Sequence, residues 1–283
     1  MNPVALIGAG LALNGAAAAI AARLGSVDAG GAVTGAIIGA VIFVAGGPLF
    51  WCILGAFFLS STALGRLGRK RKQLLEALHE KGGKRDYLQV LANGGIGMIM
   101  ALAYRITGNP AWALGFAASF ASSSADTWAG EVGVLSRKDP VSVLTLRPVT
   151  RGISGGISLL GSIAALGGAL FVALLFWAAV RITGLPLADF LPIIAIVSAC
   201  GFAGSFVDSF LGATLQAQYA SREHAAGADS AAGAPAPLTE KRLTHGVPNR
   251  LVRGLPFVTN DVVNLASCAI AAAAGVLLHP LVA

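Results

Sequence analysis

Long apolar stretches, separated by short polar or glycine- and proline-containing stretches, recur along the whole chain. A membrane-spanning helix needs about 20 mostly apolar residues. By this criterion the pattern predicts eight spans, at residues 3–22, 30–47, 48–65, 90–107, 111–126, 153–180, 191–217 and 261–281. The second and third spans are separated at Gly46, Gly47 and Pro48, because together they are too long for one crossing. We expect an all-α, polytopic transmembrane bundle of about eight spans, forming one integral-membrane domain over residues 1–283.

Basic residues fall on one side of this predicted topology. With the N-terminus outside, one side holds 18 of the 20 Lys and Arg residues, in Arg23 and the segments 66–85, 137–151 and 222–253. Only Arg105 and Arg181 fall on the other side. Because an excess of Lys and Arg marks cytoplasmic loops, we expect both termini outside and a location in the cytoplasmic (inner) membrane.

The composition agrees with a membrane protein and excludes a soluble globule. Hydrophobic residues make up 55% of the chain and charged residues 12%, with a mean hydropathy of +0.75. The net charge of +7 arises in juxtamembrane loops without interleaved aromatic residues, so we expect anionic lipid near them and no nucleic-acid partner. Residues 224–238 are a low-complexity Ala/Gly/Pro stretch, for which we expect a disordered cytoplasmic loop.

Polar side chains cluster at the cytoplasmic ends of the predicted spans. Arg85, Gln89 and Asn93 follow one another at helical spacing before the fourth span, which would place them on one stripe. The fifth to eighth spans carry further polar or glycine-rich groups, which are Asp126 and Glu131; Arg151, Gly152, Ser154, Gly155 and Gly156; Asp208 and Gln216; and Asn260, Asp261 and Asn264.

Acids repeated at one membrane depth indicate function. A charged side chain at the bilayer centre costs roughly 2.5 to 3.5 kcal/mol on insertion scales, so such residues are rare unless they are paired or functional. Carboxylate, amide and hydroxyl oxygens are the hard ligands that Mg²⁺ prefers. We expect the glycine-rich stretch at 150–156 to open a helix, where free backbone N–H groups bind anions. Together these features predict a nucleotide or pyrophosphate site facing the cytoplasm.

The same motifs carry a family resemblance. KRDYLQVLANGG, ADTWAGEVGVLS, GISGGIS, VDSFLGATLQ and TNDVVN occur in this order over roughly residues 30–280. Here the chain resembles a widespread membrane family long catalogued as a domain of unknown function, which includes the plant phytyl-phosphate kinase. It departs from the family pattern at Gly130, where members typically carry Ser, and at 150–156, where they carry a Pro-Gly-Thr-Asn-Gly-Gly-like stretch.

The resemblance implies an isoprenyl-phosphate kinase, related to dolichol kinases and CDP-diacylglycerol synthases. Such an enzyme transfers the γ-phosphoryl group of CTP, or another nucleoside triphosphate, to phytyl, farnesyl or geranylgeranyl monophosphate. The expected Mg²⁺ ligands are Asp126, Glu131, Asp208 and Asp261, and Arg85, Asp126 and Asp208 are the expected catalytic residues. Phosphate and nucleotide contacts are expected from Asn93, Arg151, Gly152, Ser154, Gly155, Gly156, Gln216, Asn260 and Asn264.

Two other classes of membrane protein could use the same residues. A transporter or channel could bind ions with these acids, but it favours acids near the midplane and an internal repeat, neither of which is evident. A CDP-alcohol phosphotransferase would carry its spaced aspartates on one segment, which this chain lacks. The preferred nucleotide, the lipid chain length and the oligomeric state stay open, and an oligomer is compatible with the pattern.

Overall fold

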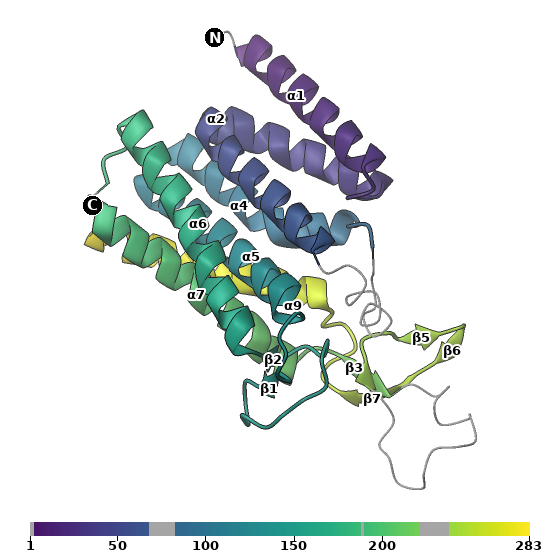
Figure 1. Ribbon diagram of the computed structural model, residues 1–283. Coiled ribbons are helices and arrows are strands. Elements are labelled where there is room, and N and C mark those ends of the chain that lie inside the picture. Colours follow the sequence, from purple (N-terminus) through teal and green to yellow (C-terminus); the bar gives the residue numbers. More distant parts are fainter. Residues whose placement is uncertain (1–2, 68–82, 188–189, 221–237) are drawn as a thin grey trace, which may run out of the picture.

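The computed structural model describes residues 3–67, 83–187, 190–220 and 238–283, which form a helical bundle with short strands at one end (Figure 1). The helices of these segments are α1 (Pro3–Arg23), α2 (Ala29–Arg66), α4 (Tyr87–Thr107), α5 (Pro110–Gly133), α6 (Leu159–Thr183), α7 (Phe190–Thr214), α9 (Asn260–Leu278) and the short 3-10 helix η1 (His279–Leu281). The predicted disordered loop lies outside the described residues except for Leu238, which begins a strand.

The short strands lie in the loops between helices. β1 (Val141–Ser142) pairs antiparallel with β2 (Gly156–Ile157). β3 (Gln218–Ala220) lies between β4 (Leu238–Thr239) and β7 (Arg250–Arg253), and β5 (Leu243–Thr244) pairs with β6 (Val247–Pro248). The chain is mostly helical, as expected, but the prediction of an all-α fold misses these strands. Each is two to four residues long, too short for an alternating pattern to show.

Helix α2 doubles back on itself at Gly47. Gly47 has φ 79° and ψ −178°, which interrupts the helix immediately before Pro48. The N–H of Asp28 donates to the Arg85 carbonyl (3.0 Å), and the Arg85 side chain donates to Thr62 Oγ1 (3.4 Å), so both ends of α2 meet at Arg85. A straight helix of 38 residues would separate them by about 57 Å. The predicted break is therefore confirmed, and the two halves form a hairpin (Figure 1).

Six of the described helices are long and apolar enough to cross a membrane, with α2 counted once. The bundle also exposes large apolar side chains, such as Ile106, Leu191 and Leu277, as contact with lipid requires. Helix α5 is not among the six, although its residues from Ala113 to Ala125 are all buried. It contacts α2, α4, α6, α7 and α9, so its serine-rich sequence faces protein rather than lipid.

Glycines bring three helices close to α5. A Cβ atom at Gly168 of α6 would lie 2.7 Å from the Ser124 carbonyl oxygen, and one at Gly201 of α7 would lie 2.5 Å from the Ala121 Cβ. A Cβ at Gly275 of α9 would lie 2.8 Å from the Ala118 Cβ. Since small residues allow such backbone approach where lipid supplies no hydrophobic drive between helices, these glycines set the spacing around α5.

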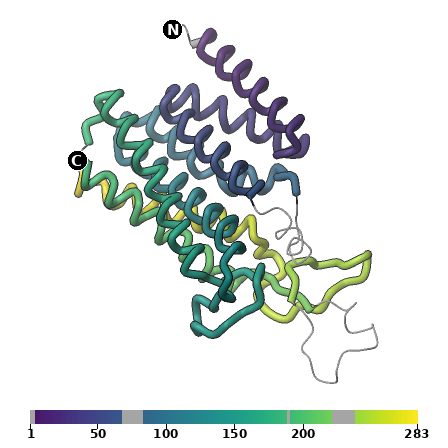
Figure 2. Tube along the Cα trace, in the orientation of Figure 1, coloured from purple at the N-terminus to yellow at the C-terminus, as the bar shows by residue number. Residues whose placement is uncertain are grey.

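Both termini lie at the end of the bundle opposite to the strands (Figures 1 and 2). Arg105 and Arg181 occupy the last turns of α4 and α6, which end at the end of the bundle that holds both chain termini, called the terminal end below. Arg23 and Arg66 occupy the last turns of α1 and α2, which end near the strands. The strand end therefore carries the loops that sequence predicts to be basic.

Candidate functional site

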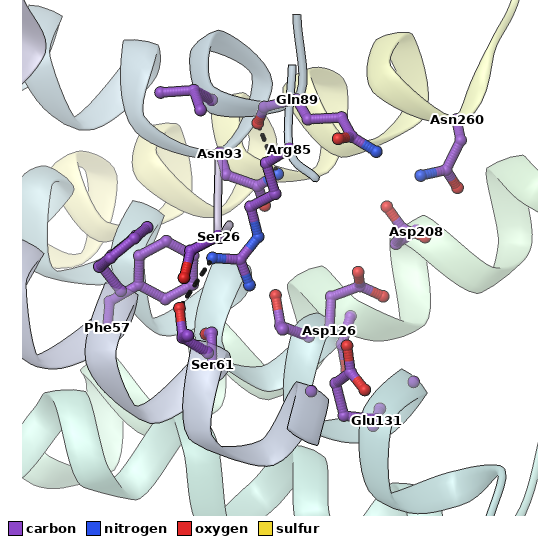
Figure 3. A pocket seen from close by; sticks show the side chains of 18 of the residues that line it. Ser26, Phe57, Ser61, Arg85, Gln89, Asn93, Asp126, Glu131, Asp208 and Asn260 are labelled. Carbon is purple, nitrogen blue, oxygen red and sulfur yellow. Dashed lines mark hydrogen bonds between the residues drawn. The ribbon is translucent and has the colours of Figure 1, made fainter. Parts of the chain in front are cut away.

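A cavity of about 1060 Å³ enters the bundle at the strand end. One part of it is polar, and Figure 3 shows the side chains of Arg85, Asn93, Asp126, Asp208 and Asn260 around this part. The other part extends between α1 and the α2 hairpin. It is lined mainly by small and apolar side chains, including Ala17, Ala18, Ile38, Leu54 and Phe57. One continuous space therefore has a charged part and an apolar part.

Two acids from different helices meet in the polar part. The carboxyl groups of Asp126 on α5 and Asp208 on α7 lie beside each other (Figure 3), and Ser267 Oγ of α9 donates to Asp208 Oδ2 at 3.3 Å. Two carboxylates in contact repel each other unless a proton or a cation lies between them. Mg²⁺ is commonly bound by one or two carboxylates together with substrate phosphates, so this pair fits such an ion.

The other two predicted metal ligands lie apart from this pair. Glu131 also lines the cavity, but its carboxylate lies beside Gly65 and near Arg85. Asp261 is buried in the first turn of α9 and does not line the cavity, because Asn260, its neighbour, takes the position that faces it. Among the described residues, no three His, Cys, Asp or Glu side chains lie close enough to share one metal ion. The four predicted ligands are thus not brought together.

Arg85 is a fixed cation in the cavity wall. Its backbone is held by Ser26 and Asp28, its Nη1 donates to Thr62 Oγ1, and its guanidinium lies 5.6 Å from the centre of the Phe58 ring. Burial lowers the pKa of the Arg85 guanidinium, and the negative charge of Glu131 opposes this shift. Arginine nevertheless keeps its proton in proteins. Arg85 can therefore bind an anionic group in the cavity.

The predicted stripe before the fourth span is only partly helical. Helix α4 begins at Tyr87, after a capping box in which Asp86 Oδ1 accepts from the Gln89 N–H and Gln89 Oε1 accepts from the Asp86 N–H. Arg85 therefore lies outside the helix. It still lines the cavity together with Gln89 and Asn93, because the cap directs the preceding residue back toward α2.

The glycine-rich stretch does not open a helix, which corrects the expectation from sequence. Helix α6 begins at Leu159, where Ser158 Oγ caps it by accepting from the Gly161 N–H. Gly152 and Gly155 have φ values of 81° and 88°, which a right-handed helix cannot accommodate. The stretch therefore does not present the free backbone N–H groups of a helix N-terminus. Residues 151–156 form a loop that lines the cavity, with Gly155 packed closely on Ala213.

Arg151 and Ser154 hold neighbouring loops. The Arg151 guanidinium forms a 2.9 Å ion pair with Asp139 and also donates to the carbonyls of Ser136 and Arg137. Ser154 Oγ donates to Glu240. These contacts attach the 151–156 loop to segments on either side of it, so both residues have structural roles in addition to their place in the cavity lining.

Glu240 was missed by the sequence reasoning. It accepts from Ser154 and from Gln216 Nε2 (2.9 Å), and so joins the loop after β4 to the end of α7. The available signal was weak, because Glu240 lies among basic loop residues after the low-complexity stretch. Gln216 lies two residues after the end of α7 and does not line the cavity. The buried Asn264 on α9 does not line it either.

The fold and these embedded polar groups define an integral membrane protein with a polar cavity at one end of its bundle. The chain belongs to the family described as Integral membrane protein DUF92, which matches residues 12–272. This confirms the family resemblance seen in the sequence.

Curated relatives include proteins from a plant, a bacterium and an archaeon. The chain is 32% identical to Protein PGR of Arabidopsis thaliana over 209 residues, which is 68% of this chain and 72% of that protein. It is 32% identical to an uncharacterized membrane protein of Synechocystis over 183 residues, 64% of this chain and 68% of the relative. It is 26% identical to the chloroplastic Protein VTE6 of Arabidopsis over 152 residues, which is 52% of this chain and 46% of VTE6. No solved structure matches the chain.

Proposed function

We propose that this protein is a kinase that converts an isoprenyl monophosphate to its diphosphate, with CTP or another nucleoside triphosphate as donor. The observation that carries the proposal is the continuous cavity, which joins the Asp126–Asp208 pair and Arg85 to an apolar space between α1 and α2. A phosphorylated lipid is divided in the same way, into a charged head group and an apolar tail. Similarity to VTE6 and resemblance to a family that includes the phytyl-phosphate kinase support this choice.

The reaction requires charge neutralisation and positioning rather than a strong base. An oxygen of the acceptor phosphate, already anionic, forms a bond to the γ-phosphorus while the bond from that phosphorus to its β,γ-bridging oxygen breaks. The nucleoside diphosphate leaves with that oxygen. Holding two polyanions in line in this way supplies much of the rate enhancement.

Specific side chains of the cavity serve these needs. Asp126 and Asp208 would hold Mg²⁺, which offsets the negative charge of the transferring phosphoryl group. Arg85 binds the acceptor phosphate, and Asn93 and Asn260 orient phosphate oxygens through their amide groups. The backbone of Gly152, Gly155 and Gly156 borders the donor phosphates. Asp261, Gln216 and Asn264 are left out of the proposed site, because they do not line the cavity.

The proposal includes a topology. We count eight crossings by treating the two halves of α2 as separate spans and by including the buried helix α5, so that the proposed spans are α1, the two halves of α2, α4, α5, α6, α7 and α9. We place both termini outside and the strand end on the cytoplasmic side of the inner membrane, since the loops at the strand end carry the basic residues. The polar part of the cavity then faces cytoplasmic nucleotide, and the whole chain acts as one catalytic domain.

The proposal is tested with purified protein in lipid nanodiscs. Radiolabelled CTP, ATP, GTP and UTP are each combined with Mg²⁺ and with phytyl, farnesyl or geranylgeranyl monophosphate. We expect label in the lipid diphosphate with at least one pair, and none with the Asp208→Asn variant. The alternative is tested with the same protein in proteoliposomes, where transport would appear as uptake of a labelled ion or other solute. If no combination of nucleotide and isoprenyl monophosphate yields a labelled diphosphate at any Mg²⁺ concentration, while such uptake occurs, the protein is a transporter and not a kinase.

A further inference from the structure

We propose that the apolar part of the cavity binds the isoprenyl chain of the lipid, and that Trp51 and Asn14 close its far end and so limit the chain length. This inference rests on the proposed function, because it assigns the tail of the same substrate. It commits to one occupant, since the apolar space is continuous with the polar part that holds Arg85 and the two acids.

The lining residues that lie farthest from Arg85 along α1 and along the second half of α2 form a hydrogen-bonded polar pair. Asn14 and Trp51 both line the cavity, and Trp51 Nε1 donates to Asn14 Oδ1 at 2.8 Å. Asn14 also donates from Nδ2 to the Gly10 carbonyl at 2.8 Å, and only 5% of it is exposed. Within a bilayer the indole N–H finds few other partners, so this bond holds the Trp51 ring between α1 and α2.

Two further contacts fix the pair. A Cβ at Gly39 would lie 2.0 Å from Asn14 Oδ1, so the Asn14 amide lies directly on the α2 backbone where only glycine leaves room. The Phe43 ring packs edge-on against Trp51, with centroids 6.3 Å apart. The indole is therefore held from two sides. A chain that extends from Arg85 between α1 and α2 meets a rigid obstacle there.

Between Arg85 and Trp51 the wall is built from small residues. Gly55 lies one helical turn from Trp51 on the same face of α2, and a Cβ added there would meet nothing within 4 Å. Ala17, Ala18 and Ala21 of α1 and Gly35 of α2 line the same space. These small residues leave a passage that a single larger side chain would block.

The length of this passage sets the expected limit. Trp51 precedes Thr62, the partner of Arg85, by 11 positions, or about 16 Å along the helix. An extended isoprene unit has four main-chain carbon–carbon bonds of about 1.5 Å, which span about 5 Å. The passage therefore fits roughly three isoprene units, and a fourth reaches Trp51.

The experiment measures competition between farnesyl and geranylgeranyl monophosphate for one donor. Gly55→Leu should lower the ratio of geranylgeranyl to farnesyl product about tenfold, and Trp51→Ala should raise it by a similar factor, as expected when a pocket loses or gains several methylene groups of space. Gly15→Leu is the matched control, because Gly15 lies on the exposed side of α1, outside the cavity lining, with open space around it. An unchanged ratio in Gly55→Leu, which has room to fold, overturns the proposal.

A second measurement separates this proposal from the kinase proposal. Farnesyl monophosphate carrying a diazirine on its terminal isoprene unit is bound to the wild-type protein without nucleotide and then photolysed. We expect cross-links at or beside Asn14 and Trp51, and their loss in Gly55→Leu. Cross-links confined to other helices would overturn the tail site even if the protein is an active kinase. Cross-links at Trp51 in a protein without kinase activity would support the tail site and refute only the proposed reaction.

Discussion

The carboxyl groups of Asp126 and Asp208 lie beside each other in the cavity although they come from different helices, α5 and α7. A third helix reaches the same point, because Ser267 of α9 donates to Asp208. Asp126 lies seven residues before the end of α5, and Asp208 lies six before the end of α7. The pair is therefore about 10 Å inside the strand end of the bundle.

We predict that Asp126→Asn and Asp208→Asn each lower phosphoryl transfer at least about a hundredfold, as the loss of one preorganised charge at a reaction centre does. Expression and thermal stability in detergent should be nearly unchanged, because an amide is less costly than a carboxylate in a membrane. Initial rates and melting curves of the two variants check both statements. Near wild-type turnover in either variant would remove that residue from the metal site.

Asp261→Asn provides a contrasting case. The family resemblance implies that this acid binds Mg²⁺, whereas the structure buries it on α9 outside the cavity lining. We therefore expect the variant to keep the Mg²⁺ concentration dependence of the wild type, within about threefold in its midpoint. Mg²⁺ titration of the initial rate is the measurement. A large shift to higher Mg²⁺ would show that Asp261 reaches the ion after all.

Arg85 should act on the acceptor phosphate. We predict that Arg85→Gln raises the KM for isoprenyl monophosphate at least about tenfold, because a charge-assisted contact to phosphate is lost. The KM for the nucleotide should change less. Arg23→Gln is the matched control, since Arg23 ends α1 outside the cavity lining. Equal increases in both KM values would argue against an acceptor-specific role.

The approach of α7 to α5 should be sensitive to one methyl group. We predict that Gly201→Ala destabilises the bundle by about 1 to 3 kcal/mol, because its Cβ would lie 2.5 Å from the Ala121 Cβ and 2.8 Å from the Ala121 carbonyl carbon. Gly8→Ala, on the exposed side of α1 with open space around it, should leave the thermal midpoint in detergent unchanged or slightly higher. A stable Gly201→Ala variant would mean that the two helices are less closely packed.

Sidedness can be measured without knowledge of the substrate. We predict that a cysteine at Ser136 reacts with a membrane-impermeant maleimide only from the cytoplasmic side, and one at Thr183 only from the outside. Thr183 ends α6 at the terminal end of the bundle, and Ser136 follows α5 at the strand end. Labelling of right-side-out cells and of inverted vesicles checks this. The reverse pattern would contradict the proposed topology.

Much of the bundle could be predicted from the local pattern. The break at Gly46, Gly47 and Pro48 was found because no single crossing accommodates so long an apolar run. Helix boundaries were less accurate where capping decides them. The sixth span was predicted from residue 153, but the positive φ angles at Gly152 and Gly155 delay the helix to Leu159. Similarly, α5 continues to Gly133, beyond its predicted end at residue 126, and so carries Glu131.

The sequence by itself determined that the chain is membrane-embedded and which polar residues are unusual in membrane spans, because apolar span length and the cost of buried charge depend on local composition. Only the tertiary structure decided which of these residues meet. It paired Asp126 with Asp208, set Asp261 and Gln216 apart, and joined Asn14 to Trp51 across two helices. The physical reason is that such contacts depend on the rotation and crossing of each helix, which long-range packing at glycines such as Gly201 fixes.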